Sequence, residues 1–162
     1  PELFKNFLTR RSEDTNLNIG INDKAYEFKS MQDFFIMSER SLNTFSLSEA
    51  NDVEASTNYK IEKTVSIPTQ DINSILETYF HSKNLDLLSI DTEGLDFLIL
   101  QALDFNKYSP KILCVETLTF SAAGKEKKRT DLIDFIISKG YFVYADTYIN
   151  TIFVNNEIWN SR

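Results

Sequence analysis

The chain has 162 residues, of which 42% are hydrophobic and 25% charged, and its net charge is −7. This length suits a single domain, and this composition excludes a disordered chain. The negative charge disfavours a broad phosphate-binding face, so we expect no nucleic-acid partner.

Three further counts narrow the class of protein. No apolar run approaches the roughly 20 residues that a membrane-spanning helix needs. Cys114 is the single cysteine and cannot form an internal disulfide, so we expect a reducing, cytoplasmic setting. The four glycines are scattered, which excludes a glycine-rich phosphate or dinucleotide loop within these residues.

The first part of the chain predicts a helix followed by strands. Apolar residues at helical spacing predict a helix within residues 1–11. Alternating apolar and polar residues predict a strand over 17–21, which ends in a turn at Asn22 and Asp23. The stretch 45–58 is rich in serine, asparagine and glutamate, and it predicts a short helix inside a long loop.

From residue 60 the pattern alternates between strand and helix. Residues 61–67 predict a strand that stops at Pro68, with Thr69 capping the helix that follows. Residues 85–90 form a short apolar run, typical of a parallel strand buried on both faces. The remaining predicted elements are a helix over 95–103, a buried strand over 112–115, a helix that Thr130 caps and that ends just before Gly140, and an antiparallel hairpin of 141–144 and 149–154. This order predicts one α/β domain over 1–162, with a parallel or mixed sheet covered by helices.

Three acidic residues follow the two predicted parallel strands. Asp91 and Glu93 come directly after the first strand, and Glu116 ends the second. In open α/β sheets, ligands bind at the carboxyl ends of the strands. Carboxylates there can hold a ligand amine, accept hydrogen bonds from hydroxyl groups, ligate a divalent cation or act as a base. Gly94 either lets the backbone approach a ligand closely or simply begins the next helix.

Structural roles are open for the same residues. Asp91 or Thr92 can cap the following helix, and Glu93 can favour its N-terminal dipole. Glu116 can be an acidic residue at the rim of the sheet without a further role. The basic cluster within 125–129 predicts a solvated loop that enters a helix, although an anionic substrate can use such a cluster.

The segment around these acids resembles a known family. Residues 85–96 read Leu-Asp-Leu-Leu-Ser-Ile-Asp-Thr-Glu-Gly-Leu-Asp. This segment resembles the FkbM family of S-adenosylmethionine-dependent methyltransferases, which shows a hydrophobic strand ending in Ile-Asp-x-Glu-Gly. After a helix, the family has a tyrosine–proline segment and a strand ending in glutamate, similar to residues 108–116. The segments 16–23, 71–76 and 150–154 look similar too.

The resemblance implies a fold, a cofactor and a reaction. The fold is the Rossmann-like, doubly wound sheet of class I methyltransferases, and the cofactor is S-adenosylmethionine. The reaction is methyl transfer to an oxygen of a carbohydrate-like or small-molecule acceptor. Asp91 and Glu93 would line the reaction cleft, Glu116 would lie on the acceptor side, Gly94 would approach the cofactor and Asp23 would contact its adenine side.

The resemblance also implies that part of the family's domain is missing. The family's glycine-rich loop and the acid that holds the ribose belong before residue 1, so about one βαβ unit, at least roughly 30 residues, is absent. We expect exposed edges on the strands near Leu17 and Leu87. The chain is then either the C-terminal piece of a longer enzyme or a fragment with rearranged strand pairing, for example in a homodimer. We expect the isolated chain to bind S-adenosylmethionine weakly or not at all.

Two other functions remain open on the sequence. In the first, Asp91 and Glu93 hold a divalent cation for glycosyl transfer from a sugar nucleotide. In the second, the chain is a non-catalytic domain that self-associates or binds a partner.

Overall fold

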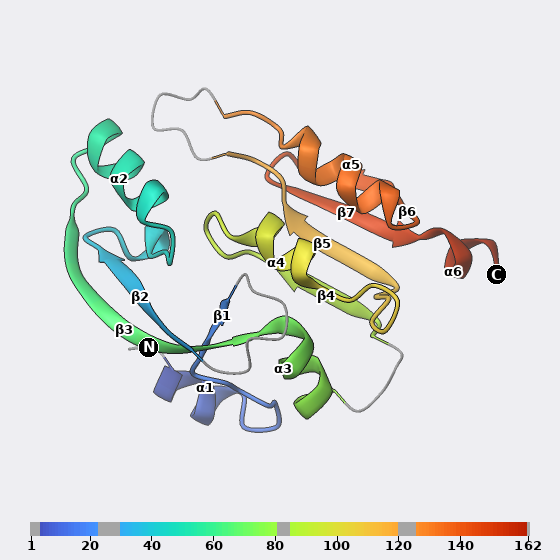
Figure 1. Cartoon of the computed structure of the whole chain (residues 1–162), viewed down its shortest axis with the longest axis horizontal. Helices are drawn as coiled ribbons and strands as arrows, with labels where there is room; N and C mark the ends of the chain where they lie inside the picture. The colour runs from blue at the N-terminus through green and yellow to red at the C-terminus, as the bar shows by residue number, and fades with distance from the viewer. Residues whose placement is uncertain (1–3, 23–29, 81–84, 120–125, 162) are drawn as a thin grey trace.

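The computed structural model describes residues 4–22, 30–80, 85–119 and 126–161. Its strands form a three-stranded sheet in the order β1-β3-β2 and a four-stranded sheet in the order β4-β5-β7-β6, which lie side by side (Figure 1). The strands are β1 (Gly20–Asn22), β2 (Ser30–Met37), β3 (Ile61–Asp71), β4 (Leu87–Ile90), β5 (Ile112–Glu116), β6 (Tyr141–Asp146) and β7 (Asn150–Asn155). The helices are α1 (Phe4–Arg10), α2 (Leu47–Ser56), α3 (Ile72–Tyr79), α4 (Asp96–Ala102), α5 (Thr130–Ser138) and α6 (Asn156–Asn160), and η1 (Arg40–Leu42) is a 3₁₀ turn.

The division into two sheets bears on the predicted fold. The α/β class is confirmed and is consistent with a methyltransferase-like fold, while the exact Rossmann-like arrangement stays a prediction. In the described part of the chain, β1 pairs with β3 alone and β4 pairs with β5 alone. Each of these strands therefore ends its sheet, as the expectation of exposed edges required.

The four-stranded sheet carries the two predicted parallel strands and the hairpin. β4 is parallel to β5, while β7 is antiparallel to both β5 and β6. The prediction that 85–90 is buried on both faces is wrong, since Leu87 on β4 is 54% exposed at the sheet edge. The inner strand β5 is better covered, and its Leu113 and Val115 are completely buried.

A single large apolar core supports this sheet. The helices α4 and α5 contribute the side chains that the helical spacing predicted, among them Ile99, Leu132 and Ile136, all fully buried. Tyr141 closes the core at the start of β6, where its hydroxyl donates a hydrogen bond of 2.7 Å to the carbonyl oxygen of Pro110. This packing fixes the ends of β4 and β5, where the acidic residues lie.

The strand β3 differs from its prediction at Pro68. It does not stop at this proline but continues to Asp71, and Pro68 pairs with Met31 of β2. β1 pairs with β3 only from Thr69 onward, so one edge of β3 is free at Pro68, and an edge position tolerates proline. As a result Thr69 lies inside the strand, and the residue that caps α3 is Asp71.

The cap at Asp71 makes a measurable contribution to stability. Its Oδ1 accepts the backbone N–H of Ser74 at 3.1 Å, and the side chain is fully buried. We expect Asp71→Ala to lower the free energy of unfolding by about 1 kcal/mol in urea titration, whereas Asp71→Asn, which keeps the acceptor, changes it little. Asp86→Ala is the matched control, because the carboxylate of Asp86 is exposed and pairs with Lys111 at the surface. Equal losses in Asp71→Ala and Asp86→Ala would contradict the capping role.

Smaller differences concern where elements begin. β1 starts at Gly20 rather than near Leu17, and Thr130 is the first residue of α5 rather than its cap. The predicted end of α5 is confirmed, since Gly140 follows it with a left-handed φ of 90°. Within the described ranges, no helix has the length and apolar run that spanning a bilayer needs.

Candidate functional site

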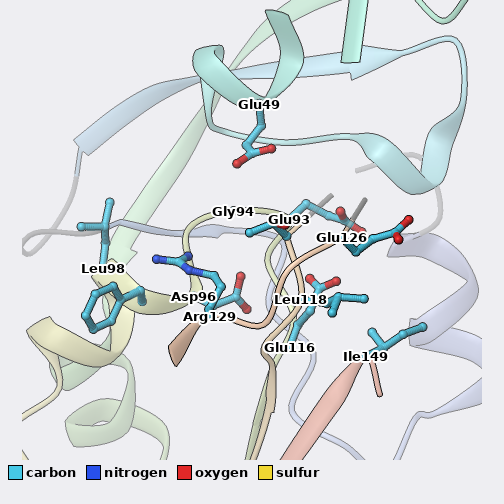
Figure 2. A pocket seen from close by; sticks show the side chains of 12 residues that line it. Glu49, Glu93, Gly94, Asp96, Leu98, Glu116, Leu118, Glu126, Arg129 and Ile149 are labelled. Atoms are coloured by element: carbon cyan, nitrogen blue, oxygen red, sulfur yellow. The ribbon is translucent and has the colours of Figure 1, made fainter. Parts of the chain in front are cut away.

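The three predicted acids come together at one edge of the four-stranded sheet. Ile90 at the end of β4 pairs with Val115, so Asp91 and Glu93 follow β4 at the level where Glu116 ends β5. Beside them lies a cavity of about 590 Å³. Figure 2 shows the side chains that line it, which are Glu49, Glu93, Gly94, Asp96, Phe97, Leu98, Glu116, Leu118, Thr119, Glu126, Arg129 and Ile149.

The loop between β4 and α4 has an unusual backbone. Glu93 has a left-handed φ of 50° and Gly94 follows with a φ of 104°. The Thr44 hydroxyl donates a hydrogen bond of 2.7 Å to the carbonyl oxygen of Glu93, and this bond holds the turn from the side of the three-stranded sheet. A strained residue at a cavity is typical of a position selected for function rather than for local stability.

The capping interpretation of this loop is wrong. The residue before α4 is Leu95, and it makes no side-chain cap. The side chain that satisfies a backbone donor is Asp96, which is 4% exposed and accepts the N–H of Thr92 at 3.1 Å. Neither Asp91 nor Thr92 therefore caps α4, and the carboxylate of Asp91 is left for another role.

Gly94 is required by both conformation and space. A Cβ atom on this residue would lie 2.6 Å from Cγ of Glu49, far closer than such atoms approach, and φ is left-handed. The close approach brings α2 down onto the loop, so that Glu49 faces the cavity from above in Figure 2. The structure thus gives Gly94 a packing role, and the prediction that it approaches a cofactor stays untested.

This contact can be tested against a matched glycine. Gly140 also has a left-handed φ, but a Cβ atom there would meet nothing within 4 Å. We expect Gly140→Ala to lower the free energy of unfolding by about 1 kcal/mol and Gly94→Ala by roughly twice that, measured by urea unfolding. In the double variant Gly94→Ala/Glu49→Ala, the loss of unfolding free energy should fall to that of Gly140→Ala. If Gly94→Ala and Gly140→Ala lower the free energy of unfolding by the same amount, the contact with Glu49 contributes nothing to the cost of Gly94→Ala.

Glu49 reaches the cavity because another group takes its expected partner. The sequence Ser46-Leu47-Ser48-Glu49 has the capping-box spacing, in which the glutamate accepts the N–H of the cap residue. Here the Ser46 N–H instead donates to the Thr44 hydroxyl at 2.9 Å, while the Ser46 hydroxyl caps α2 by accepting the Glu49 N–H at 3.2 Å. The Glu49 carboxylate is left to face the cavity.

Two acids that line the cavity, Glu93 and Glu116, have a strongly raised pKa. Burial raises the pKa of Glu93 from its usual 4.5 to about 7, with smaller contributions from the neighbouring charges of Asp91, Asp96 and Glu49. The pKa of Glu116 is also raised to about 7, first by burial and then by the same three carboxylates and Glu93. Both groups are therefore near half ionisation at neutral pH, which suits proton transfer.

Two further acids show weaker versions of the same effect. The pKa of Asp91 is raised by burial and by the charge of Asp96, although Asp91 is not among the residues that line the cavity. The pKa of Glu49 is raised by burial and by Asp52, while the nearby Arg129 lowers it. Asp91 therefore acts on the cavity mainly through its charge, by raising the pKa of the two glutamates inside.

Arg129 is the cation that lines this acidic cavity. Its guanidinium lies 5.3 Å from the centre of the Phe97 ring and pairs with Asp131 at 3.1 Å. The neighbouring Lys128 donates hydrogen bonds to Asp146 at 2.7 Å and to the Thr117 hydroxyl at 3.0 Å. The interpretation of this cluster as a solvated loop is therefore wrong for these two side chains, which are about one quarter exposed at 27% and 26%.

Two residues that line the cavity were missed by sequence reasoning, and one predicted contact is not described. Glu49 lies in a stretch with weak periodicity, and Asp96 looks like an ordinary acid in the first turn of a helix. Arg129 belongs to the basic cluster within 125–129 that the sequence analysis singled out. Asp23, the predicted adenine-side contact, lies outside the described residues.

The donor set of the cavity is mainly acidic. The lining includes five carboxylate side chains and one guanidinium. In the described ranges, no group of three or more histidine, cysteine, aspartate or glutamate residues is arranged to hold a metal ion. Two of the lining carboxyl groups have a pKa of about 7, and such groups can interact with cationic or hydroxyl-bearing ligands.

Comparison with known proteins agrees with the resemblance seen in the sequence. The family model of the methyltransferase FkbM domain matches residues 1–143. No curated protein and no solved structure matches the chain significantly. The matched segment contains the described elements from α1 to α5 and the first residues of β6, and with them every residue that lines the cavity except Ile149.

Proposed function

We propose a function from one premise: the chain belongs to the methyltransferase FkbM domain family. From this premise we infer that it takes part in the transfer of a methyl group from S-adenosylmethionine to a hydroxyl oxygen. The acceptor is a carbohydrate-like or other small molecule. The cavity beside β4 and β5 is the place of reaction, with Glu93 and Glu116 as its acid–base groups.

The cavity fits the cationic part of S-adenosylmethionine. This cofactor carries a positive sulfonium and a positive ammonium group, and when bound it supplies the methyl group. Glu93, Glu116 and Asp96 place negative charge around the cavity, and such charge favours a cationic ligand. The lining holds Gly94 but no glycine-rich loop, so the described residues suit the sulfonium and ammonium groups and not the nucleoside.

The observation that carries the proposal is the position of Glu116, which ends β5 and lines the cavity. β5 is an inner strand of its sheet, and its neighbours β4 and β7 fix Glu116 from both sides. Burial raises the pKa of Glu116 to about 7, so this carboxyl group is a stronger base than an ordinary glutamate and is still half ionised at neutral pH. In the proposed reaction, Glu116 accepts the hydroxyl proton of the acceptor, while burial and then the charges of Asp91 and Glu93 keep its pKa high.

Incorporation of a labelled methyl group tests the proposed function. The intact protein is incubated with methyl-tritiated S-adenosylmethionine and a panel of free sugars, methyl glycosides and small alcohols, with simple carboxylic acids and amines as a second panel. Label that remains on the acceptor after mild base is expected, because methyl ethers withstand base while methyl esters do not. Label on no hydroxyl compound, together with label on a carboxyl or amine compound, would exclude oxygen methylation of this acceptor class.

The other two functions have weaker support. Glycosyl transfer with a divalent cation would require a set of metal ligands, and the described acids are not arranged as one. Self-association stays a prediction, with the open edge of β4 as its structural basis. A cytoplasmic location also stays a prediction that rests on the single cysteine.

A further inference from the structure

Two short segments, 116–119 and 126–129, form one wall of the cavity. They pair through an antiparallel bridge between Leu118 and Lys128. From these segments the cavity is lined by Glu116, Leu118, Thr119, Glu126 and Arg129 (Figure 2). Thr117 and Lys128 are not lining residues, as expected where the side chains of extended segments alternate between two sides. The side chains of Thr117 and Lys128 are therefore free to contact each other behind this wall.

Lys128 makes three polar contacts behind the wall. Its Nζ donates to Oγ1 of Thr117 at 3.0 Å and to Oδ1 of Asp146 at 2.7 Å, and a longer contact of 3.4 Å reaches Oγ1 of Thr151. The two threonine hydroxyls also form a hydrogen bond of 2.6 Å with each other, and both threonines are fully buried. An ammonium group has three N–H donors, so these three contacts use all of them.

The three acceptors belong to the ends of three strands. Thr117 directly follows β5, Asp146 is the last residue of β6, and Thr151 is the second residue of β7. The Thr117 N–H also donates to the carbonyl oxygen of Ile149 at 2.9 Å. One lysine side chain therefore joins the three strands at the level where Glu116 ends β5. Because Glu116 directly precedes Thr117 in the chain, a displacement of Thr117 also moves Glu116.

The charge of Lys128 has no direct effect on the pKa of Glu116. Burial is the first cause of the raised pKa of Glu116, and the other causes are the charges of Asp91, Glu93, Asp96 and Glu49. The hydrogen bond from Lys128 lowers the pKa of Asp146, so this carboxylate is ionised at neutral pH and offsets the charge of Lys128. The link between Lys128 and Glu116 is therefore the backbone of Thr117.

We propose that Lys128 is a positioning residue, which fixes the end of β5 through Thr117 and so keeps the carboxyl group of Glu116 in the wall of the cavity. This inference rests on the proposed function, in which Glu116 is the base. A base must lie within hydrogen-bond reach of the proton that it accepts, and a misplacement of about 1 Å costs about a hundredfold in rate. Burial in the wall also keeps the pKa of Glu116 near 7, so a displaced and more hydrated Glu116 would have a lower pKa.

The chain offers a matched lysine at the other end of β5. Lys111 directly precedes this strand, and its Nζ lies 2.7 Å from Oδ1 of Asp86, the same distance as between Lys128 and Asp146. The pair at Lys111 is more exposed, with side chains 42% and 79% exposed against 26% and 47%. Lys111→Met therefore removes an equal charge from β5 without changing the wall of the cavity.

An NMR titration of the intact protein tests this role without any ligand. Glutamate labelled with ¹³C at its side-chain carboxyl group reports the pKa of each glutamate, and Glu116→Gln assigns the signal of Glu116. In Lys128→Met we expect the pKa of Glu116 to fall from about 7 toward its usual 4.5. Loss of a nearby positive charge alone would raise this pKa, so the direction of the change separates position from charge. Lys111→Met should leave the pKa of Glu116 at about 7.

Kinetics and a second variant complete the test. In the methyl-transfer assay, Lys128→Met should lower kcat about tenfold and leave the KM for S-adenosylmethionine within about twofold, because the base is displaced while binding is kept. Thr151→Val removes one acceptor of Lys128 and should lower the pKa of Glu116 as well. This variant keeps the inference testable if Lys128→Met does not fold.

The inference is overturned by an unchanged or raised pKa of Glu116 in folded Lys128→Met or, where that variant does not fold, in Thr151→Val. A higher KM with an unchanged kcat in Lys128→Met would overturn it too. The proposed function fails separately. A lowered pKa of Glu116 in these variants, without methyl transfer by the unchanged protein, would contradict the proposed function and leave the positioning role standing.

Discussion

Glu116→Gln is expected to lower the turnover of the intact protein by about a hundredfold at pH 8, the low end of what an acid–base group contributes. The variant keeps the size of the side chain but cannot accept a proton. The rate of the unchanged protein should rise with pH and level off above about 7, because the pKa of Glu116 is raised to about 7 and a base must be ionised to act. In Glu116→Gln this rise should disappear.

Two comparisons make the result specific to the site. Glu157→Gln removes an exposed glutamate on α6, remote from the cavity lining, and should leave both the rate and its pH dependence unchanged. Glu93→Gln should move the rise of the rate to lower pH, because the charge of Glu93 is one of the causes that raise the pKa of Glu116. If Glu116→Gln kept full turnover and an unaltered pH profile, Glu116 would have a structural role and would not be the base.

The placement of the acids could be predicted from sequence because it depends on local patterns. A continuous apolar run ending in Asp91 and a second ending in Glu116 predict two neighbouring parallel strands, and parallel strands end at the same edge of a sheet. The register of β4 and β5 confirms this placement. The antiparallel hairpin and the end of α5 at Gly140 follow from equally local signals and are also confirmed.

The rest of the site depends on contacts between distant segments, which a single sequence does not encode visibly. Glu49 faces the cavity because the Thr44 hydroxyl takes the N–H that a capping box would assign to the glutamate. Pro68 looks like a strand terminator, but β3 passes through it because no partner strand lies on that edge there. The capping-box rule and the proline rule are both sound as local rules. In each case a contact with a distant segment determines the structure that forms.

The division of the described strands into two sheets also depends on contacts that local patterns do not encode. Strand and helix alternation indicates an α/β fold but does not say which strands pair. β3 is paired with β2 along most of its length and with β1 only at its end, so it completes a sheet of its own. Only hydrogen bonding between strands distinguishes that arrangement from a continuous sheet, and the apolar pattern of β3 is compatible with either.

The second large prediction is that this site makes the folded state less stable as pH rises from about 4.5 to 7. In the folded state Glu93 and Glu116 have a pKa of about 7, against the 4.5 of an ordinary glutamate in the unfolded chain. Between these values the folded state keeps protons that the unfolded state has lost, so raising the pH favours unfolding. This loss of stability is absent below pH 4.5 and complete above pH 7. Because both side chains are only half-buried, solvent screening reduces the loss of unfolding free energy to about 1 kcal/mol for each glutamate.

Removing these charges should therefore stabilise the protein while it removes activity. At pH 8 the free energy of unfolding of the double variant Glu93→Gln/Glu116→Gln is expected to be about 2 kcal/mol higher than that of the unchanged chain. Near pH 4.5 the two free energies of unfolding should be equal. Urea titrations at several pH values measure this, with Glu157→Gln as the control that changes nothing. A double variant that is destabilised at pH 8 would show that the two carboxylates support the fold. A stabilised but inactive variant is the pattern expected of groups kept for their chemistry, since a site that holds unfavourable charge does so at the expense of stability.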